Sequence, residues 1–313
     1  MILNISGATQ AYLADLNVTQ QQINRDTAEV SSGLAVQQPS DDPDADASIL
    51  QTQADIGLNQ QIQSNLGNVT SELQTADSAL QAAVQAVQSA GTLASEAANS
   101  TATSTDLAGY AQQVAALQQT LVGISQTTFN GSYIFSGDQD TGPMYQLDAS
   151  QPDGVQQLFS TPSTRVIVDA TGTSIPVAET AQQIFDAQNP DGSDASGNVF
   201  AAVNSLLTAL NNTSLSPSDR QAAIAQAGSA IQTAGTYLNQ QLEFYGEAED
   251  RVSASSDLAQ KFQTQQQAEL SNLRDADIPT VATQLTQAQT QQQAALSAEA
   301  EIQQQKNLFS YLA

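Results

Sequence analysis

Residues 62–94 read IQSNLGNVTSELQTADSALQAAVQAVQSAGTLA, and apolar side chains recur through this stretch at alternating steps of four and three residues. The positions are Ile62, Leu66, Val69, Leu73, Ala76, Leu80, Ala83, Val87, Ala90 and Ala94. This spacing keeps one narrow apolar stripe on one side of a helix, as in a coiled-coil seam. Because a helix rises about 1.5 Å per residue, the stretch predicts a rod several nanometres long. Rods of this kind favour a role in assembly over one that needs an enclosed pocket.

The same apolar period returns at both ends of the chain, and we predict that these ends are helices that pack side by side. The predicted assembly residues are Leu16, Ile23, Val30, Ile278, Val281, Leu285, Ile302, Phe309 and Leu312. Gln292, Glu299 and Lys306 interrupt the C-terminal seam. Isolated helices with weak seams are marginal in water, so we expect residues of about 1–35 and 280–313 to be ordered only when neighbouring subunits cover them.

The period changes in the middle of the chain, at Asn130-Gly131, and the helical period returns near Ala178. Short β-strands are predicted at residues 132–137, 144–147, 155–159, 165–168 and 174–177, between clusters of Gly, Pro and Asp. We expect residues 131–180 to hold the one substantial sheet. A further short helix is predicted near residues 199–210, and a long one from Pro217 onward.

The predicted fold is mainly α: long antiparallel, coiled-coil-like helices from both chain ends, with a small antiparallel β domain inserted in the middle. Three domains are expected. Residues 1–40 and 275–313 form a terminal coiled-coil core, residues 41–130 and 217–274 a long-helix bundle, and residues 131–216 an inserted β-rich domain with short helices.

Composition argues against several classes of function. The net charge is −25, from 32 acidic and 7 basic residues, so the chain has no basic patch that could neutralise phosphates or an anionic membrane surface. Cys and His are absent, which removes thiol nucleophiles, Cys/His zinc sites and His-based catalytic triads. We predict no nucleic-acid or membrane partner, no cofactor, no metal site and no catalytic residue. The N-terminus lacks the pattern of a cleaved signal peptide.

Acidic clusters allow a functional and a structural interpretation. Asp41, Asp42, Asp44 and Asp46 could hold a hard cation, but their spacing lacks the Gly and the terminal Glu of a calcium loop. Helix capping explains them without a metal, since Asp42 suits an N-cap and Pro43 the first helical position. No pair of carboxylates stands out for glycoside chemistry.

Three motifs, in this order, resemble the flagellin superfamily and, within it, the hook–filament junction proteins, which are flagellin-like hook-associated proteins. Residues 30–33 (VSSG) followed by 39–43 (PSDDP) form the first. Residues 128–137 (TFNGSYIFSG) form the second, and residues 307–312 (NLFSYL) the third. The resemblance covers about residues 1–140 and 217–313. Leu34-Ala35 replaces basic residues usual in the family, and Ala313 extends the end, so contacts of those basic residues are not expected here.

The resemblance implies a structural subunit of the bacterial flagellum that joins hook to filament. Such a protein is exported to the outside through the flagellar type III channel without a cleaved signal. It would form a homo-oligomeric ring next to another hook-associated protein and flagellin, with an export chaperone on its C-terminal helix beforehand. Its terminal helices would form the inner core and its β domain the outside. Flagellin itself or a minor filament subunit is the alternative, and an enzyme carried by the middle domain is the third possibility.

Overall fold

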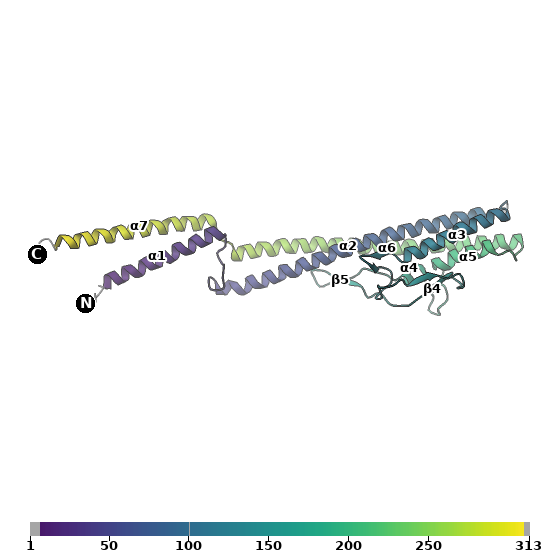
Figure 1. Ribbon diagram of the computed structural model, residues 1–313, viewed down its shortest axis with the longest axis horizontal. Coiled ribbons are helices and arrows are strands. Elements are labelled where there is room, and N and C mark those ends of the chain that lie inside the picture. Colours follow the sequence, from purple (N-terminus) through teal and green to yellow (C-terminus); the bar gives the residue numbers. More distant parts are fainter. Residues whose placement is uncertain (1–6, 100, 310–313) are drawn as a thin grey trace. The chain divides into compact units, whose positions relative to one another are not determined.

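The computed structural model describes the backbone of residues 7–99 and 101–309, and the side chains of residues 10–99 and 101–301. The chain divides into two compact units. We call Met1–Leu58 with Gln263–Ala313 the terminal unit, and Asn59–Phe262 the central unit. Two long helices, α2 (Pro43–Ala97) and α6 (Pro217–Arg274), contribute to both units. The predicted mainly helical fold with a small β insertion is confirmed (Figure 1).

The terminal unit is built from α1 (Gly7–Ser32), the start of α2, the end of α6 and α7 (Ile278–Phe309). Gly33 ends α1: its φ of 76° is the left-handed conformation that favours glycine, and its N–H donates to the Glu29 carbonyl at 2.8 Å. Asp42 begins α2, since one carboxylate oxygen accepts hydrogen bonds from the N–H groups of Asp44 and Ala45, each at 3.1 Å. Asp42 is therefore the N-cap of α2, as its place before Pro43 predicted.

The core of the central unit forms where α2 packs against α6, and the predicted seam in residues 62–94 is the buried side of α2. Leu66, Leu73, Leu80 and Val87 are buried there, whereas Ile62 and Val69 are half-buried. Small residues allow the two helices to approach closely. An added Cβ at Gly235 would lie 3.4 Å from Val87, and one at Gly228 would lie 3.4 Å from Ala94.

Shorter elements complete the central unit and lie beside the two long helices (Figure 1). The helix α3 (Ser104–Ser125) begins with a capping box between Thr103 and Asp106 and packs against α5 (Val199–Asn211). A single short helix, α4 (Ala181–Phe185), follows the strands.

The middle of the chain contains three separate antiparallel strand pairs, where one sheet over residues 131–180 was expected. They are β1 (Thr128–Phe129) with β2 (Ser132–Tyr133), β3 (Tyr145–Leu147) with β4 (Val155–Gln157), and β5 (Val166–Val168) with β6 (Ser174–Pro176). Each strand has only two or three residues, because turns occupy most of the intervening chain. The predicted strand at residues 132–137 ends at Tyr133, and its remaining apolar residues enter the core from a turn.

Candidate assembly site

The two terminal helices of the chain pack against each other, as predicted (Figure 1). They run antiparallel, because the end of α1 lies beside the start of α7: the Ala276 N–H donates to the Gly33 carbonyl at 2.9 Å. Farther along the pair, the amide of Gln292 donates to the side-chain oxygen of Gln20 at 2.6 Å. The structure thus brings the predicted N-terminal and C-terminal seams into one helix pair.

A short backbone ladder joins the α1–α2 connection to the α6–α7 connection. The N–H groups of Ala35 and Val36 both donate to the Arg274 carbonyl, at 2.8 and 3.2 Å, and Leu34 forms an antiparallel bridge with Asp275. Both connections lie in the terminal unit. The Leu34-Ala35 departure from the family pattern therefore falls in a segment held chiefly through its backbone.

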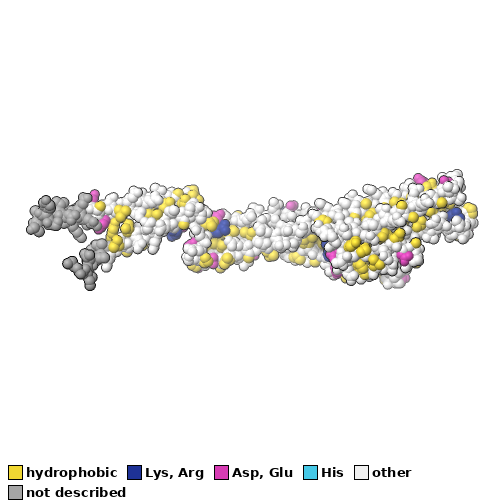
Figure 2. All heavy atoms as spheres, in the orientation of Figure 1, with side chains coloured by type: hydrophobic (Ala, Val, Ile, Leu, Met, Phe, Trp, Pro, Cys, Tyr) yellow, Lys and Arg dark blue, Asp and Glu magenta, His cyan; other side chains and the backbone are white. Residues whose placement is uncertain are grey.

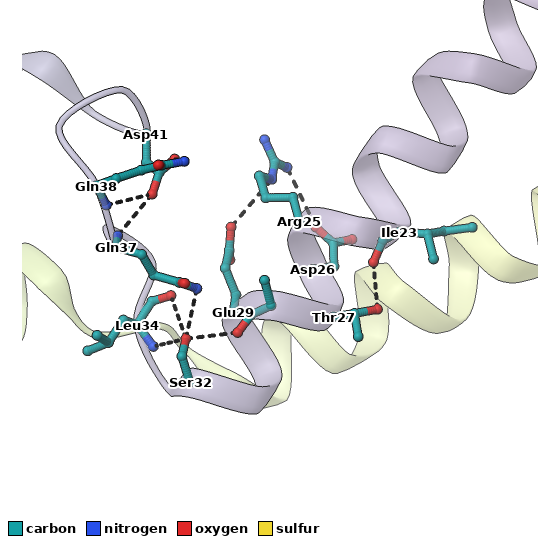
Figure 3. A network of polar contacts seen from close by, with 11 residues as sticks. Ile23, Arg25, Asp26, Thr27, Glu29, Ser32, Leu34, Gln37, Gln38 and Asp41 are labelled. Atoms are coloured by element: carbon teal, nitrogen blue, oxygen red, sulfur yellow. Dashed lines mark hydrogen bonds and ion pairs between the residues drawn. The ribbon is translucent and has the colours of Figure 1, made fainter.

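Side chains of the VSSG and PSDDP motifs form hydrogen bonds within the α1–α2 connection (Figure 3). The Ser32 hydroxyl accepts hydrogen bonds from the Leu34 N–H at 3.1 Å and from the Gln37 amide at 2.9 Å. The Asp41 carboxylate accepts from the N–H groups of Gln37 and Gln38 at 2.9 and 3.0 Å. These backbone donors hold the pKa of Asp41 below its ordinary value, since they favour the charged form. The motif thus has a structural task, which is to build the turn between α1 and α2.

The predicted assembly residues differ in how far the helix pair covers them. On α1, Leu16 and Ile23 are half-buried, whereas Val30 is 36% exposed. On α7, Val281 is buried, Leu285 is half-buried and Ile278 is 38% exposed. The side chains of Ile302 and Phe309, together with Leu312, lie outside the described residues. The third family motif, residues 307–312, lies there too.

Among the described residues, the terminal unit exposes more large apolar side chains than it buries. The exposed ones are Leu13, Val18, Val30, Leu50, Leu58, Ile278 and Leu296. Ile49, Val281 and Ala288 are its buried apolar residues, whereas the central unit holds an extensive apolar cluster. Hydrophobic side chains are visible as patches on the face of the terminal helices drawn in Figure 2. Contiguous apolar patches that a folded chain leaves in water mark a surface for a further partner.

Sequence reasoning missed Asp26, which is 1% exposed and the most deeply buried described side chain of α1. It falls on the stripe Tyr12, Thr19, Asp26 and Gly33, spaced by seven, beside the stripe Leu16, Ile23 and Val30. The two stripes together give the four-and-three steps of a complete heptad seam. Counting back in sevens from Gly33 would have identified Asp26 as a seam residue, although a charged side chain ordinarily indicates the solvated face.

The second motif, TFNGSYIFSG, folds the central unit. Asn130 and Gly131 have φ angles of 51° and 87°, which suit the tight turn between β1 and β2. Phe135 is fully buried and meets the rings of Phe185 and Tyr245 edge-on, with centroids 6.0 and 6.2 Å apart. Gly137 then allows a close backbone approach, since an added Cβ would lie 2.6 Å from the Pro162 carbonyl oxygen.

Other features of the described residues suit packing better than chemistry. A groove of about 590 Å³ between α5 and α6 is lined largely by alanine and uncharged polar side chains, and Asp194 is its one titratable group among the described residues. No three acidic side chains of the described part of the chain are placed to hold a metal ion together. None of the described helices is both long and apolar enough to cross a bilayer.

Helical regions from both ends of a chain, paired and flanking a small strand-containing insertion, define the flagellin class of fold. The model of the bacterial flagellin N-terminal helical region matches residues 3–140, and that of the C-terminal helical region matches residues 229–312. Together these regions make up more than half of the chain, which therefore belongs to the bacterial flagellin family of structural proteins. Comparison with curated proteins finds no match.

Solved structures share the fold at low sequence identity. A Vibrio parahaemolyticus protein described as a flagellar hook-associated protein is 19% identical, with a TM-score of 0.65 over 75% of this chain and 100% of that one. Flagellar hook-associated protein 3 of Legionella pneumophila is 14% identical, with a TM-score of 0.62 over 72% and 98%. The flagellar junction protein FlgL of Legionella pneumophila is 14% identical, with a TM-score of 0.55 over 66% and 99%. At these identities the likeness is one of fold.

Proposed function

We propose that this chain is a structural subunit that joins the flagellar hook to the filament and assembles through its terminal helices. The observation that carries the proposal is the terminal unit, which pairs α1 with α7 yet leaves seven large apolar side chains exposed among its described residues. Such a surface suits a subunit whose helices become fully covered only by other subunits. The likeness in fold to a flagellar junction protein supports a place at the hook–filament boundary.

The proposed partners follow from this place in the flagellum. Copies of the chain would form a homo-oligomeric ring, with another hook-associated protein on one side and flagellin on the other. An export chaperone would cover the C-terminal helix before export, which would proceed to the outside of the cell without a cleaved signal peptide. The assembly surface would include Leu16, Ile23, Val30, Ile278, Val281, Leu285, Ile302, Phe309 and Leu312.

We assign a separate place in the assembly to each of the three predicted domains. Residues 1–40 and 275–313 would form the inner core of the assembly, residues 41–130 and 217–274 the surrounding helical layer, and residues 131–216 the outer domain. No catalytic role is proposed: the buried Asp186 accepts hydrogen bonds from Tyr145 and Asn198, which suits a structural network.

Deletion of the gene tests the proposal directly. The deletion strain should carry hooks without attached filaments and should shed flagellin into the medium, while a plasmid copy of the gene restores attached filaments. Normal filaments and normal swimming in the deletion strain would refute the assignment to the junction.

The match to the flagellin family also fits the alternative function, which is that of flagellin or a minor filament subunit. The two functions differ in copy number, because a filament subunit polymerises without limit and a junction subunit stops after a short layer. Labelled antibody on isolated flagella separates them. Label confined to one short zone beside the hook supports the junction, and label along the whole filament supports the alternative.

A further inference from the structure

The seam of the terminal unit contains a buried carboxylate that lacks hydrogen bonds. Both side-chain oxygens of Asp26 are buried, and no hydrogen bond reaches either of them. The nearest described cation is Arg25, whose guanidinium lies 3.6 Å from one oxygen of Asp26 and 3.3 Å from a carboxylate oxygen of Glu29 (Figure 3). The Arg25 side chain is 66% exposed, so its guanidinium is solvated and lies between the carboxylates of Asp26 and Glu29. Such an exposed ion pair compensates little for the burial of Asp26.

The helix that covers Asp26 offers it no charge partner. The described side chains of α7 include no lysine or arginine, and their acids are Glu299 and Glu301. Tyr12, two heptads before Asp26 on the same stripe, also has a buried hydroxyl without a hydrogen bond. Two polar groups of one seam position are thus enclosed by the helix pair and left unsatisfied, and each such group costs free energy in the paired state.

The central unit shows how the same chain treats a buried carboxylate that belongs to a finished core. Asp186 is 2% exposed and accepts hydrogen bonds from the Tyr145 hydroxyl at 2.7 Å, the Asn198 amide at 2.7 Å and the Gln188 amide at 3.1 Å. Asp26 is as deeply buried as Asp186 and has no donor on either oxygen, whereas Glu179 of the central unit, with one oxygen that lacks a hydrogen bond, is only half-buried. The contrast with Asp186 indicates that the pairing of α1 with α7 within one chain is not the arrangement that satisfies Asp26.

We propose that Asp26 keeps the α1–α7 pair of the free subunit metastable, and that a neighbouring copy of this chain supplies its hydrogen-bond donors on assembly. This inference rests on the proposed function. The chemistry of α7 suits the role of donor, because exposed carboxamides line it. They are Gln284, Gln287, Gln289, Gln291 and Gln293. Each carboxamide carries two N–H donors for a carboxylate, and exchange of an unsatisfied internal pairing for a satisfied external one favours the assembled state.

Amide hydrogen exchange on the purified full-length subunit tests the first half of the proposal. Asp26→Leu removes the unsatisfied carboxylate and completes the apolar seam. It should slow amide exchange in residues 10–32 and 278–301 by about tenfold. The free-energy cost of a buried unsatisfied polar group raises the population of the open helix pair by about that factor, and the substitution removes this cost. Asp15→Leu is the matched control, since Asp15 is exposed on the same helix, and it should leave exchange unchanged. Asp26→Asn removes the charge with little change in shape and should slow exchange to a smaller extent.

Exchange as fast as in the wild type, or faster, in both Asp26 variants would overturn the metastable pair. The second half is tested by expressing the variants in the deletion strain and counting attached filaments. Asp26→Leu should restore fewer than a tenth as many filaments as the wild type, whereas Asp15→Leu restores all of them. Full restoration by Asp26→Leu would overturn the proposal that a neighbouring copy donates hydrogen bonds to Asp26. If even the wild-type gene restores nothing, the proposed function fails, and the exchange experiment still decides the role of Asp26.

Discussion

The phenolic hydroxyl of Tyr145 donates a hydrogen bond to Asp186 over 2.7 Å, and both side chains are buried in the central unit. Tyr145 lies on β3, and Asp186 directly follows α4, so the bond ties a strand pair to the helical part of the unit. Burial raises the pKa of Asp186, and the hydrogen bonds from Tyr145 and Asn198 act in the opposite direction. The polar centre of the insertion is thus a structural network.

Tyr145→Phe should destabilise the central unit by about 1–3 kcal/mol, because it removes one donor from a buried carboxylate and leaves the ring in place. Urea denaturation followed by circular dichroism measures the change. Tyr133→Phe, at a half-buried tyrosine of β2, is the control and should cost clearly less. Equal effects of the two substitutions would show that the bond to Asp186 contributes nothing particular.

Glu179 should make the stability of the central unit depend on pH. Burial raises the pKa of its carboxyl to about 6, and one of its oxygens is buried without a hydrogen bond. A raised pKa means that the folded state favours the protonated acid. The stability that protonation provides is full below the ordinary pKa of 4.5 and is lost as pH rises through about 6.

Glu179→Gln removes this dependence. The variant should be about 1 kcal/mol more stable than the wild type at pH 8 and nearly equal to it at pH 4, with allowance for partial exposure of the side chain. Thermal unfolding across this pH range provides the comparison. A difference in stability between wild type and variant that stays constant at every pH would contradict the conclusion that Glu179 causes the pH dependence.

Gly137 should not tolerate a side chain. Its φ of 60° strains any residue with a Cβ, and the added atom would also lie 2.6 Å from the Pro162 carbonyl oxygen. Gly137→Ala should therefore cost about 2 kcal/mol or more. Gly142→Ala is the matched control in the same region, since nothing lies within 4 Å of its added Cβ. Denaturation midpoints measure the stability of both variants. An unchanged midpoint for Gly137→Ala would mean that the loop at Pro162 moves aside to accommodate the added Cβ.

A charge placed in the terminal seam should block assembly without unfolding the central unit. Leu285→Asp introduces a carboxylate at a half-buried position of α7, where it would lose hydration without gaining a partner. Incorporation into flagella should fall at least tenfold, alone or together with Ile302→Asp. Val166→Asp, at a valine of β5 that is 54% exposed, should incorporate normally. Normal incorporation of Leu285→Asp would remove this residue from the proposed assembly surface.

Local and periodic features of this chain could be predicted from sequence. The heptad in residues 62–94 predicted the buried side of α2, because a repeated spacing on a helix determines which side chains share a face. Gly33 and Asp42 marked the end of α1 and the start of α2, since capping depends on residues within one helical turn. Five short strands were predicted within a single sheet, whereas the structure has three separate pairs and an additional strand, β1, because strands of two or three residues carry too little alternation to show how they pair.

Features that join distant parts of the chain were decided by tertiary structure. The seam of α1 includes a buried Asp26 only because α7, more than 250 residues later, covers that stripe. The backbone bonds from Ala35 and Val36 to Arg274, and the donors around Asp186, likewise unite segments whose separate sequences carry no sign of the partner. By itself the sequence determined where the helices run and which face of α2 is buried. The contacts between those faces required the folded chain, because a polar group's burial and hydrogen bonding depend on what packs over it.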